Sequence, residues 1–453
     1  MISATGTAGS GGTTDSGKEL SSSGRWLSVV ILGMLYFVAM LDRQILALLI
    51  PPIKADLGLT DVQVSLLQGV AFALFYVLAA IPIGWAVDRY SRRMIIWVGV
   101  TFWSIAATCC GLAQSFWQLF AARAGVGAGE ASLTPATFAI MADLFPPSRL
   151  STALSVFVIG GTVGTGLAFL VGGPLVGMLL DAGARTLPLL GEVKAWQLVF
   201  IITGVPGMLL AFLVFLLPET RTRSLPLSAT DMTEPGFGAL FRHMRPHARF
   251  YLAHNLGFAL VQAGIVAIQM WTPTFLSRIH GWSLKDAGLW LGVAQIVAPL
   301  LGLMTHGWIV DRMFRRGILD AHLRWFRVLS LCAAPLLAAA YLAPAGWMTI
   351  LGFGLVYFLT ISCASIGPAA LQIATPRPLR GRASALYVLA TGLVGAAGGP
   401  FIVAAMTDYV FGDETRLGPA IACAGILLML SASLLFTSGL GAMRRAVAAA
   451  GNG

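Results

Sequence analysis

The sequence predicts an all-α membrane protein of twelve transmembrane helices, arranged as two pseudo-symmetric bundles of six. Two observations predict this class. The 453 residues are 57% hydrophobic and only 11% charged, and the mean hydropathy is +0.83, which is outside the range of soluble globular domains. In addition, the pattern Gly-Trp-x-Val-Asp-Arg-x-x-Arg-Arg occurs at 84–93 and again at 307–316, and the offset of 307 − 84 = 223 residues is about half of the chain.

The spans follow from the length of the apolar windows, since a bilayer core of roughly 30 Å requires about 20 apolar residues per helix. Such windows begin near Trp26, Val64, Met94, Phe116, Ala153, Trp196, Phe250, Ala287, Trp325, Trp347, Ser384 and Pro419. The polar, proline-containing segment 218–249 separates the first six windows from the last six. We therefore predict a disordered cytoplasmic tail at 1–24, bundles at 25–217 and 250–443 joined by a cytoplasmic linker at 218–249, and a second tail at 444–453.

The basic residues predict the orientation of the chain. Arginines gather in the connections that follow even-numbered spans, such as 89–93, 221–249 and 312–316, whereas an opposite connection such as 51–61 carries as much acid as base. By the positive-inside rule both termini are expected in the cytoplasm, and a bacterial inner membrane is the expected location. The net charge of +10 is spread over short loops and forms no single basic face, so nucleic-acid binding is not expected.

Four charged residues stand out within the predicted spans, where each charge costs on the order of 3 kcal/mol. Asp42 and Arg43 lie in the first span, and Arg123 and Glu130 lie in the fourth, 130 − 123 = 7 residues apart and thus on one helix face. Arg43 and Arg123 are candidate substrate-binding residues, because a guanidinium grips phosphate or carboxylate through paired hydrogen bonds. Asp42 and Glu130 are candidate proton carriers, because burial favours the neutral carboxyl and a nearby guanidinium favours the ionised one.

The second half of the chain offers no matching acid within its spans. Its candidate cavity residues are uncharged, and they are Gln262, Gln269, Trp271, Tyr357 and Tyr387. A cavity with one ionic wall and one apolar, aromatic wall fits a molecule with a charged head and an apolar body. As an alternative, the four charges form two self-neutralising pairs that only lock helix packing, although buried ion pairs stabilise less than apolar packing does.

The repeated pattern predicts a gate at the cytoplasmic face. Asp88 and Asp311 can each meet the positive N-terminal end of a helix from the other half, and the adjacent arginines can reach acids such as Asp143. We expect these contacts to hold the cytoplasmic side shut and to break when it opens. The predicted gate comprises Asp88, Arg89, Arg92, Arg93, Asp143, Asp311, Arg312, Arg315 and Arg316. Anchoring by the positive-inside rule would explain the arginines but not the fixed Gly and Asp positions.

The two copies of the pattern resemble the signature of the major facilitator superfamily between spans two and three and its echo between spans eight and nine. Residues 123–146 (RAGVGAGEASLTPATFAIMADLFP), with 41–44 (LDRQ) upstream, resemble more narrowly the Spinster family of lipid transporters. The resemblance implies alternating access between two bundles and a cargo of lysophospholipid or sphingolipid type. It also implies protonatable acids at Asp42 and Glu130 and basic partners at Arg43 and Arg123.

The sequence thus predicts a proton-coupled secondary transporter of amphipathic, lipid-like molecules, acting as a monomer and without a cofactor or a metal. The alternative is a multidrug exporter that exchanges protons for lipophilic cations, in which Arg43 would be unfavourable. A membrane-embedded lipid enzyme is a remote alternative, because no Gly-x-Ser-x-Gly or His-Glu-x-x-His motif occurs and the histidines are scattered. A non-transporting sensor is equally remote.

Overall fold

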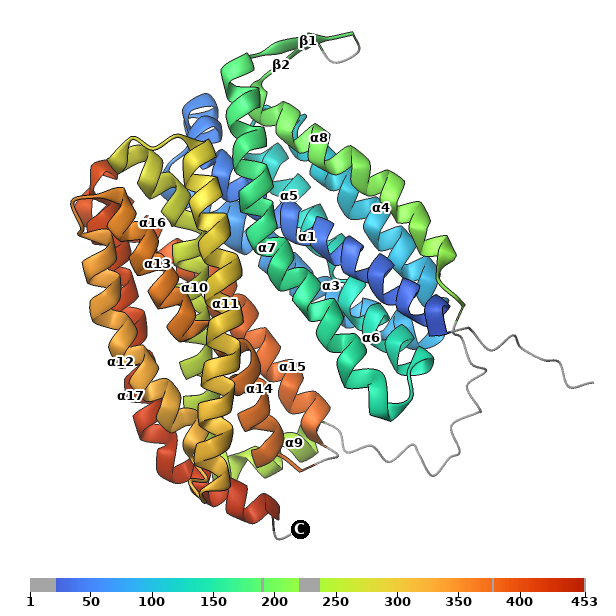
Figure 1. Ribbon diagram of the computed structural model, residues 1–453, viewed down its shortest axis with the longest axis vertical. Coiled ribbons are helices and arrows are strands. Elements are labelled where there is room, and N and C mark those ends of the chain that lie inside the picture. Colours follow the sequence, from blue (N-terminus) through green and yellow to red (C-terminus); the bar gives the residue numbers. More distant parts are fainter. Residues whose placement is uncertain (1–21, 189–190, 220–236, 377–378, 452–453) are drawn as a thin grey trace, which may run out of the picture.

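The structure is a computed structural model and is almost entirely helical (Figure 1). It describes residues 22–188, 191–219, 237–376 and 379–451. The tail predicted at 1–24 lies outside the described residues except for its last three positions, which belong to the first helix. The middle of the predicted linker also lies outside them, and the chain is described again from 237, where a short amphipathic helix begins.

The first half of the chain passes back and forth between two faces of the molecule. Its elements are α1 (Ser22–Leu57), α2 (Asp61–Ser65), η1 (Leu66–Val70), α3 (Ala71–Arg89), α4 (Arg92–Cys110), α5 (Phe116–Glu130), α6 (Leu133–Leu144), α7 (Pro147–Ala182), β1 (Arg185–Leu187), β2 (Gly191–Val193), α8 (Ala195–Leu210) and η2 (Ala211–Leu216). The two strands form an antiparallel hairpin in which Arg185 pairs with Val193.

The second half repeats this course. Its elements are α9 (Phe237–Met244), η4 (Arg245–His247), α10 (Ala248–His280), α11 (Leu284–Arg315), α12 (Ala321–Tyr341), α13 (Gly346–Thr360), α14 (Cys363–Ala374), α15 (Arg380–Ala390), η6 (Thr391–Ala397), α16 (Gly398–Ala405), η7 (Met406–Phe411), η8 (Glu414–Arg416) and α17 (Leu417–Gly451). The last helix continues to Gly451 and so includes the described part of the segment predicted as a C-terminal tail.

Eleven helical stretches of the described chain are long and apolar enough to cross a bilayer, whereas twelve were predicted. The remaining one, expected near Phe116, is divided into α5 and α6 by a break at Ala131 and Ser132, and α5 carries Arg123 and Glu130. A corresponding break at Ile361 and Ser362 separates α13 from α14 in the second half, at an offset of 361 − 131 = 230 residues. The stretch 346–374 counts as a span despite its break, so the charges of α5, and not the break, distinguish the one span that falls short.

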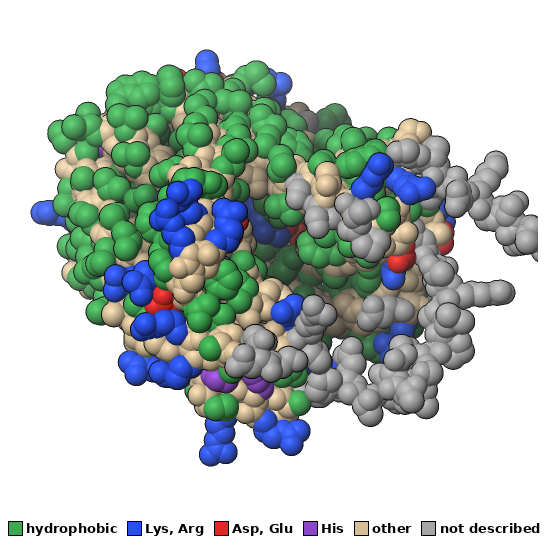
Figure 2. Space-filling model, turned by 60° about the horizontal axis from the view of Figure 1, so that its bottom comes forward, with side chains coloured by type: hydrophobic (Ala, Val, Ile, Leu, Met, Phe, Trp, Pro, Cys, Tyr) green, Lys and Arg blue, Asp and Glu red, His purple; other side chains and the backbone are tan. Residues whose placement is uncertain are grey.

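The two halves lie together at one face and diverge toward the other (Figure 1). The diverging face holds the start of α1 and the end of α17, and we call it the termini face. The opposite face, which carries the β1–β2 hairpin, is the far face. Seen from the termini face, the molecule has a hollow between its halves, with basic side chains around the rim (Figure 2).

Glycines allow the halves to approach closely where α7 crosses α11. A Cβ on Gly288 would lie 2.6 Å from the Cα of Gly173, and a Cβ on Gly292 would lie 2.7 Å from the carbonyl oxygen of Gly166. Such distances leave no room for a side chain, so these positions hold the two backbones in direct contact.

Local sequence fixes the turns at the far face. Thr60 caps α2 in a reciprocal capping box with Gln63, and Ser283 caps α11 by accepting a hydrogen bond from the backbone N–H of Asp286. Gly281 ends α10 with a φ of +65°, a conformation that glycine adopts at low cost. The helix ends at this face are therefore defined before the two halves pack together.

Candidate functional site

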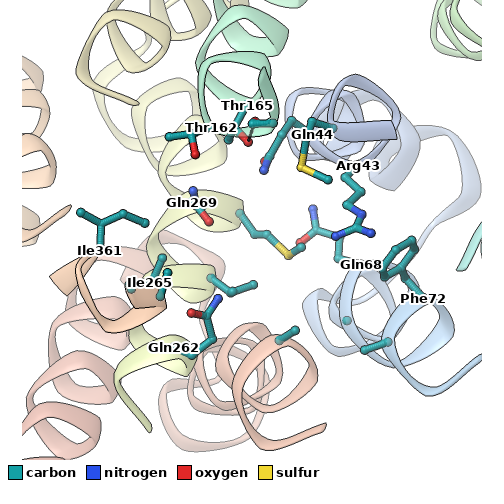
Figure 3. A pocket seen from close by; sticks show the side chains of 18 of the residues that line it. Arg43, Gln44, Gln68, Phe72, Thr162, Thr165, Gln262, Ile265, Gln269 and Ile361 are labelled. Carbon is teal, nitrogen blue, oxygen red and sulfur yellow. Dashed lines mark hydrogen bonds between the residues drawn. The ribbon is translucent and has the colours of Figure 1, made fainter. Parts of the chain in front are cut away.

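A central cavity of about 310 Å³ lies between the two halves. The labelled residues that line it are Arg43, Gln44, Gln68, Phe72, Thr162 and Thr165 from the first half and Gln262, Ile265, Gln269 and Ile361 from the second (Figure 3). A second cavity of about 290 Å³ shares Arg43, Phe72 and Gln262 with the first and extends to Tyr76 and Tyr387. The two cavities therefore meet beside Arg43.

Arg43 and Glu130 join α1 to α5 at the wall of this cavity. The Nε and Nη2 atoms of Arg43 lie 2.7 Å and 2.6 Å from Oε2 of Glu130. The guanidinium also stacks on Phe72, 4.3 Å from the ring centroid, and approaches Tyr76 at 5.5 Å. Glu130 is only 1% exposed, whereas Arg43 is 31% exposed, so the cation faces the cavity and the carboxylate stands behind it.

Arg123 and Asp42 lie near this pair but are bonded differently. Arg123 lines the central cavity and approaches Phe72 at 5.7 Å, and the described residues provide no hydrogen-bond partner for its Nε. Asp42 is 2% exposed, and neither of its carboxylate oxygens has a partner in the described part of the chain. Glu130 is thus held by Arg43 and not by Arg123, while Asp42 is sealed behind the cavity wall.

The uncharged residues predicted for the second half fall into two groups. Gln262, Gln269 and Tyr357 line the central cavity, and Nε2 of Gln269 donates to Oε1 of Gln295 and to the hydroxyl of Tyr357, both at 3.0 Å. Tyr387 lines the second cavity.

Trp271 does not line either cavity, which corrects its placement among the cavity residues. The side chain is fully buried, and its Nε1 donates to the carbonyl oxygen of Pro400 at 3.1 Å. It joins α10 to α16 and faces the interior of its own half. Sequence alone could not make this distinction, because a tryptophan in an apolar span is equally compatible with both faces of the helix.

The predicted gate residues form contacts within one half. Arg92 donates to a carboxylate oxygen of Asp143 and to the carbonyl oxygen of Ala139, all in the first half. Arg89 stacks on Trp85. Outside the side chain of Asp88, which is not described, no ion pair of these residues bridges the halves. Correspondingly, the halves are apart at the termini face (Figure 1).

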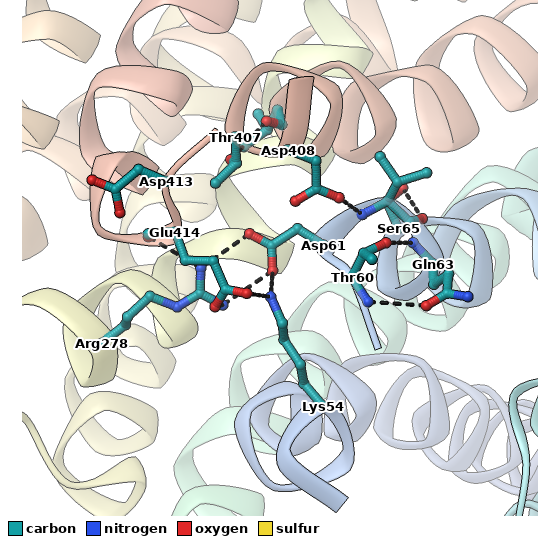
Figure 4. Close-up of polar contacts among 12 residues, drawn as sticks. Lys54, Thr60, Asp61, Gln63, Ser65, Arg278, Thr407, Asp408, Asp413 and Glu414 are labelled. Carbon is teal, nitrogen blue, oxygen red and sulfur yellow. Dashed lines mark hydrogen bonds and ion pairs between the residues drawn. The ribbon is translucent and has the colours of Figure 1, made fainter. Parts of the chain in front are cut away.

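At the far face, by contrast, charged residues bridge the halves in an arrangement that sequence reasoning missed. Asp61 accepts hydrogen bonds from Lys54 at 2.5 Å and from Nη1 and Nη2 of Arg278 at 3.0 Å and 3.1 Å. Lys54 also pairs with Glu414 at 2.6 Å (Figure 4). Lys54 and Asp61 belong to the first half and Arg278 and Glu414 to the second, and we call these four residues the far-face clasp.

One further bond strengthens this closure, since Asp408 accepts from the backbone N–H of Val62 at 2.8 Å. The signal for the clasp in the sequence was weak. Each of its members looks like an ordinary charge at a helix end, and only the fold brings positions as distant as 61 and 278 together.

Two related helical bundles that enclose a central cavity, closed at one face and open at the other, define a membrane transporter that works by alternating access. The sequence profile of the Major Facilitator Superfamily matches residues 32–400, and the chain belongs to this superfamily. Within it the chain is similar to Spinster proteins, which are two of the following three relatives.

An "MFS-type efflux pump" of Mycolicibacterium smegmatis is 29% identical over 413 residues, which cover 90% of each chain. "Protein spinster homolog 1" of Xenopus laevis is 26% identical over 421 residues, covering 87% of this chain and 76% of the relative. The crystal structure of a bacterial homolog to the human lysosomal transporter Spinster, inward-facing and unoccupied, superimposes with a TM-score of 0.77 at 25% identity, over 95% of this chain and 98% of that one. The predicted family and fold class are thereby confirmed, and the chain is a transporter and not an enzyme.

Proposed function

We propose that the protein is a proton-coupled secondary transporter of amphipathic, lipid-like molecules of lysophospholipid or sphingolipid type. One observation carries the proposal: Arg43 faces both cavities and is bound from behind by the buried carboxylate of Glu130. A guanidinium in this position binds a phosphate or carboxylate headgroup. Apolar side chains across the cavity, such as Ile265 and Ile361, can contact the hydrocarbon part (Figure 3).

The geometry supports a specific form of proton coupling. The ionised carboxylate of Glu130 and an anionic headgroup compete for the same guanidinium of Arg43. When a headgroup takes the hydrogen bonds of Arg43, Glu130 is left buried without its cation, which costs several kcal/mol and is relieved by protonation. Proton and anion therefore bind together, and the expected mode is symport. Asp42, which is buried and has no hydrogen-bond partner among the described residues, is a second candidate carrier in the same bundle.

This coupling is tested in proteoliposomes that contain a pH-sensitive dye. Addition of lysophosphatidylglycerol, which carries a single negative charge, is expected to acidify the lumen. Glu130→Gln keeps an oxygen that can accept from Arg43 but cannot be protonated, so it should exchange labelled lipid without acidification. Asp413→Asn, which alters an acid of a far-face loop, is the matched control and should behave as wild type. Equal acidification by wild type and Glu130→Gln would contradict the proposed coupling.

The second candidate function is export of lipophilic cations in exchange for protons, and the name of the mycobacterial relative, an efflux pump, favours it. Here the acids would bind the drug and Arg43 would repel it. Arg43→Ala should then improve drug export, whereas under the lipid proposal it removes charge-assisted hydrogen bonds of about 1.5–3 kcal/mol and lowers lysolipid transport by roughly 10- to 100-fold. Parallel transport assays of a lysolipid and a lipophilic cation on this variant separate the two.

In the lipid proposal, the termini face is cytoplasmic in a bacterial inner membrane and the protein acts as a monomer. The cavity then opens to the cytoplasm in this structure. The gate residues around Asp88 and Asp311 would meet across the halves only in the other state, after the far-face clasp has opened. The Arg92–Asp143 contact within the first half keeps one of these arginines in place for that encounter.

A further inference from the structure

Gln68 presents a buried and unpartnered amide at the wall of the central cavity. The residue is 3% exposed, and neither Nε2 nor Oε1 has a hydrogen-bond partner among the residues that the structure describes. A buried amide without partners is unfavourable, and such groups in native structures are expected to have a reason. Since Gln68 lines the cavity, a ligand can supply the missing partners.

The local backbone holds Gln68 in this position. Residues 66–70 form the π-helical turn η1, which interrupts the second span, and single π turns inside helices occur frequently at functional sites. The next residue, Gly69, packs against η6 of the other half, where a Cβ would lie only 2.9 Å from the Cα of Ala397. The turn cannot shift without separating the halves, so the amide of Gln68 remains at the cavity in this state.

The side-chain amides across the cavity from Gln68 already form hydrogen bonds. Gln269 donates to Gln295 and Tyr357, and Oε1 of Gln262 accepts from the thiol of Cys363 at 3.6 Å. Gln68 and Arg43 lie on one side of the cavity, and Gln262 and Gln269 lie across from them (Figure 3). A headgroup bound by Arg43 therefore brings its neighbouring groups to the side of the cavity where the free amide is.

We infer that Gln68 selects substrates with a hydroxyl group next to the anionic group that Arg43 binds, an inference that rests on the proposed function. The hydroxyl donates to Oε1 of Gln68, and an oxygen of the headgroup accepts from Nε2. Substrates without the hydroxyl leave the amide oxygen buried and unpaired, which lowers transition-state binding. The substrate class is thus narrowed to amphiphiles with a hydroxyl beside a phosphate or carboxylate, such as a glycerol-based headgroup.

The experiment compares two probes that differ in one group. 1-Lauroyl-glycerol 3-phosphate carries a free hydroxyl on its middle carbon, and 3-lauroyloxypropyl phosphate lacks only that hydroxyl. Wild-type protein in proteoliposomes should transport the hydroxylated probe with a kcat/KM about tenfold higher. Gln68→Met, which keeps the length and approximate volume of the side chain, should transport both probes with equal kcat/KM. Gln68→Leu provides a second variant without hydrogen-bonding capacity. The matched control is Gln44→Leu, which removes a partly exposed amide from the same cavity and should preserve the tenfold ratio.

The outcomes separate this inference from the proposed function. Equal transport of both probes by wild type, or a preserved ratio in Gln68→Met or Gln68→Leu, would overturn the role of Gln68 while leaving lipid transport intact. Failure of folded wild-type protein to transport either probe would overturn both. If Gln44→Leu also loses the tenfold preference for the hydroxylated probe, then any amide of the cavity wall contributes to it. That result would also overturn the assignment to Gln68.

Discussion

The far-face clasp leads to a prediction about the balance between the two states of the transporter. Arg278→Gln removes the guanidinium that reaches across the halves to the fully buried carboxylate of Asp61. Asp61 keeps its bond to Lys54, which lies in the same half, so the substitution leaves no unpaired buried charge. The change therefore weakens the closed far face while leaving each half intact, and the population should shift toward the state that is open at the far face.

The magnitude follows from the bonds that are lost. A hydrogen bond to a charged group contributes about 1.5–3 kcal/mol, and Arg278 makes two to one carboxylate. The glutamine side chain can still donate a hydrogen bond and so restores part of this energy. The Lys54–Glu414 pair still bridges the halves, although Glu414 is 55% exposed and solvent weakens that contact. A net loss of about 2 kcal/mol in the closed state shifts the ratio of closed to open molecules roughly 30-fold.

Distance measurements between spin labels test this shift. Labels at Gln114→Cys and Ala345→Cys lie on exposed far-face loops of the two halves, in a background where the exposed Cys109, Cys332 and Cys423 are replaced by serine. Arg278→Gln should increase the population with a long distance between these labels. The control Arg416→Gln removes an exposed ion pair within one half, Arg416–Asp413 at 3.9 Å, and should leave the distances unchanged. An unchanged or narrowed distance distribution in Arg278→Gln would refute the clasp as the element that holds the far face shut.

Three further outcomes are expected. When lysolipid is added to detergent-solubilised protein in weak buffer, the protein should take up a proton, because the headgroup displaces Glu130 from Arg43. A pH electrode measures this uptake, and Glu130→Gln should abolish it. Gly288→Val should abolish transport although the protein still inserts in the membrane, because the Cβ would lie 2.6 Å from the backbone of Gly173. The control Gly354→Ala should transport as wild type, since its Cβ would meet only a methyl group at 3.9 Å. Trp271→Phe should lower the free energy of unfolding by about 1–3 kcal/mol, because the hydrogen bond to the carbonyl oxygen of Pro400 is lost, and transport per folded molecule should be unchanged. A loss of transport without a loss of stability would instead show that Trp271 contributes to the cavity.

Much of the fold could be predicted from the sequence, because span length and the duplicated pattern are properties of contiguous residues. The back-and-forth course of the spans follows from hydropathy and from the placement of the basic loops. The division of the fourth span at Ala131 and Ser132 was not predicted, although glycines at 125, 127 and 129 weaken the helix before it. At Gly127 the glycine serves close packing, since a Cβ there would lie 2.4 Å from the carbonyl oxygen of Phe72 in α3.

The candidate site was predictable to the extent that it depends on helix periodicity. Placing Arg123 and Glu130 on one face, and treating them together with Asp42 and Arg43, required only their spacing and the cost of charge in a bilayer. The choice of Arg43 as the partner of Glu130 depends on how α1 and α5 cross, which the sequence does not reveal. Gln68 was missed for a related reason: a single glutamine in an apolar span gains meaning only when its lack of partners is visible.

The position of the Arg43–Glu130 pair determines how movement and protonation can be linked. Both residues belong to the first half, so a rocking motion of one half against the other leaves their contact unchanged. A change of distance between the halves therefore cannot by itself alter the protonation of Glu130. In the proposed function a headgroup can alter it, because the headgroup enters the cavity and competes with Glu130 for Arg43. The clasp, in turn, involves the far end of the helix that carries Arg43, since Lys54 lies 54 − 43 = 11 residues further along α1, about 16 Å at 1.5 Å per residue. In the proposed function, rocking therefore controls which face the cavity reaches, and occupancy of Arg43 controls the proton. Transport would be coupled because both conditions apply to the same helix.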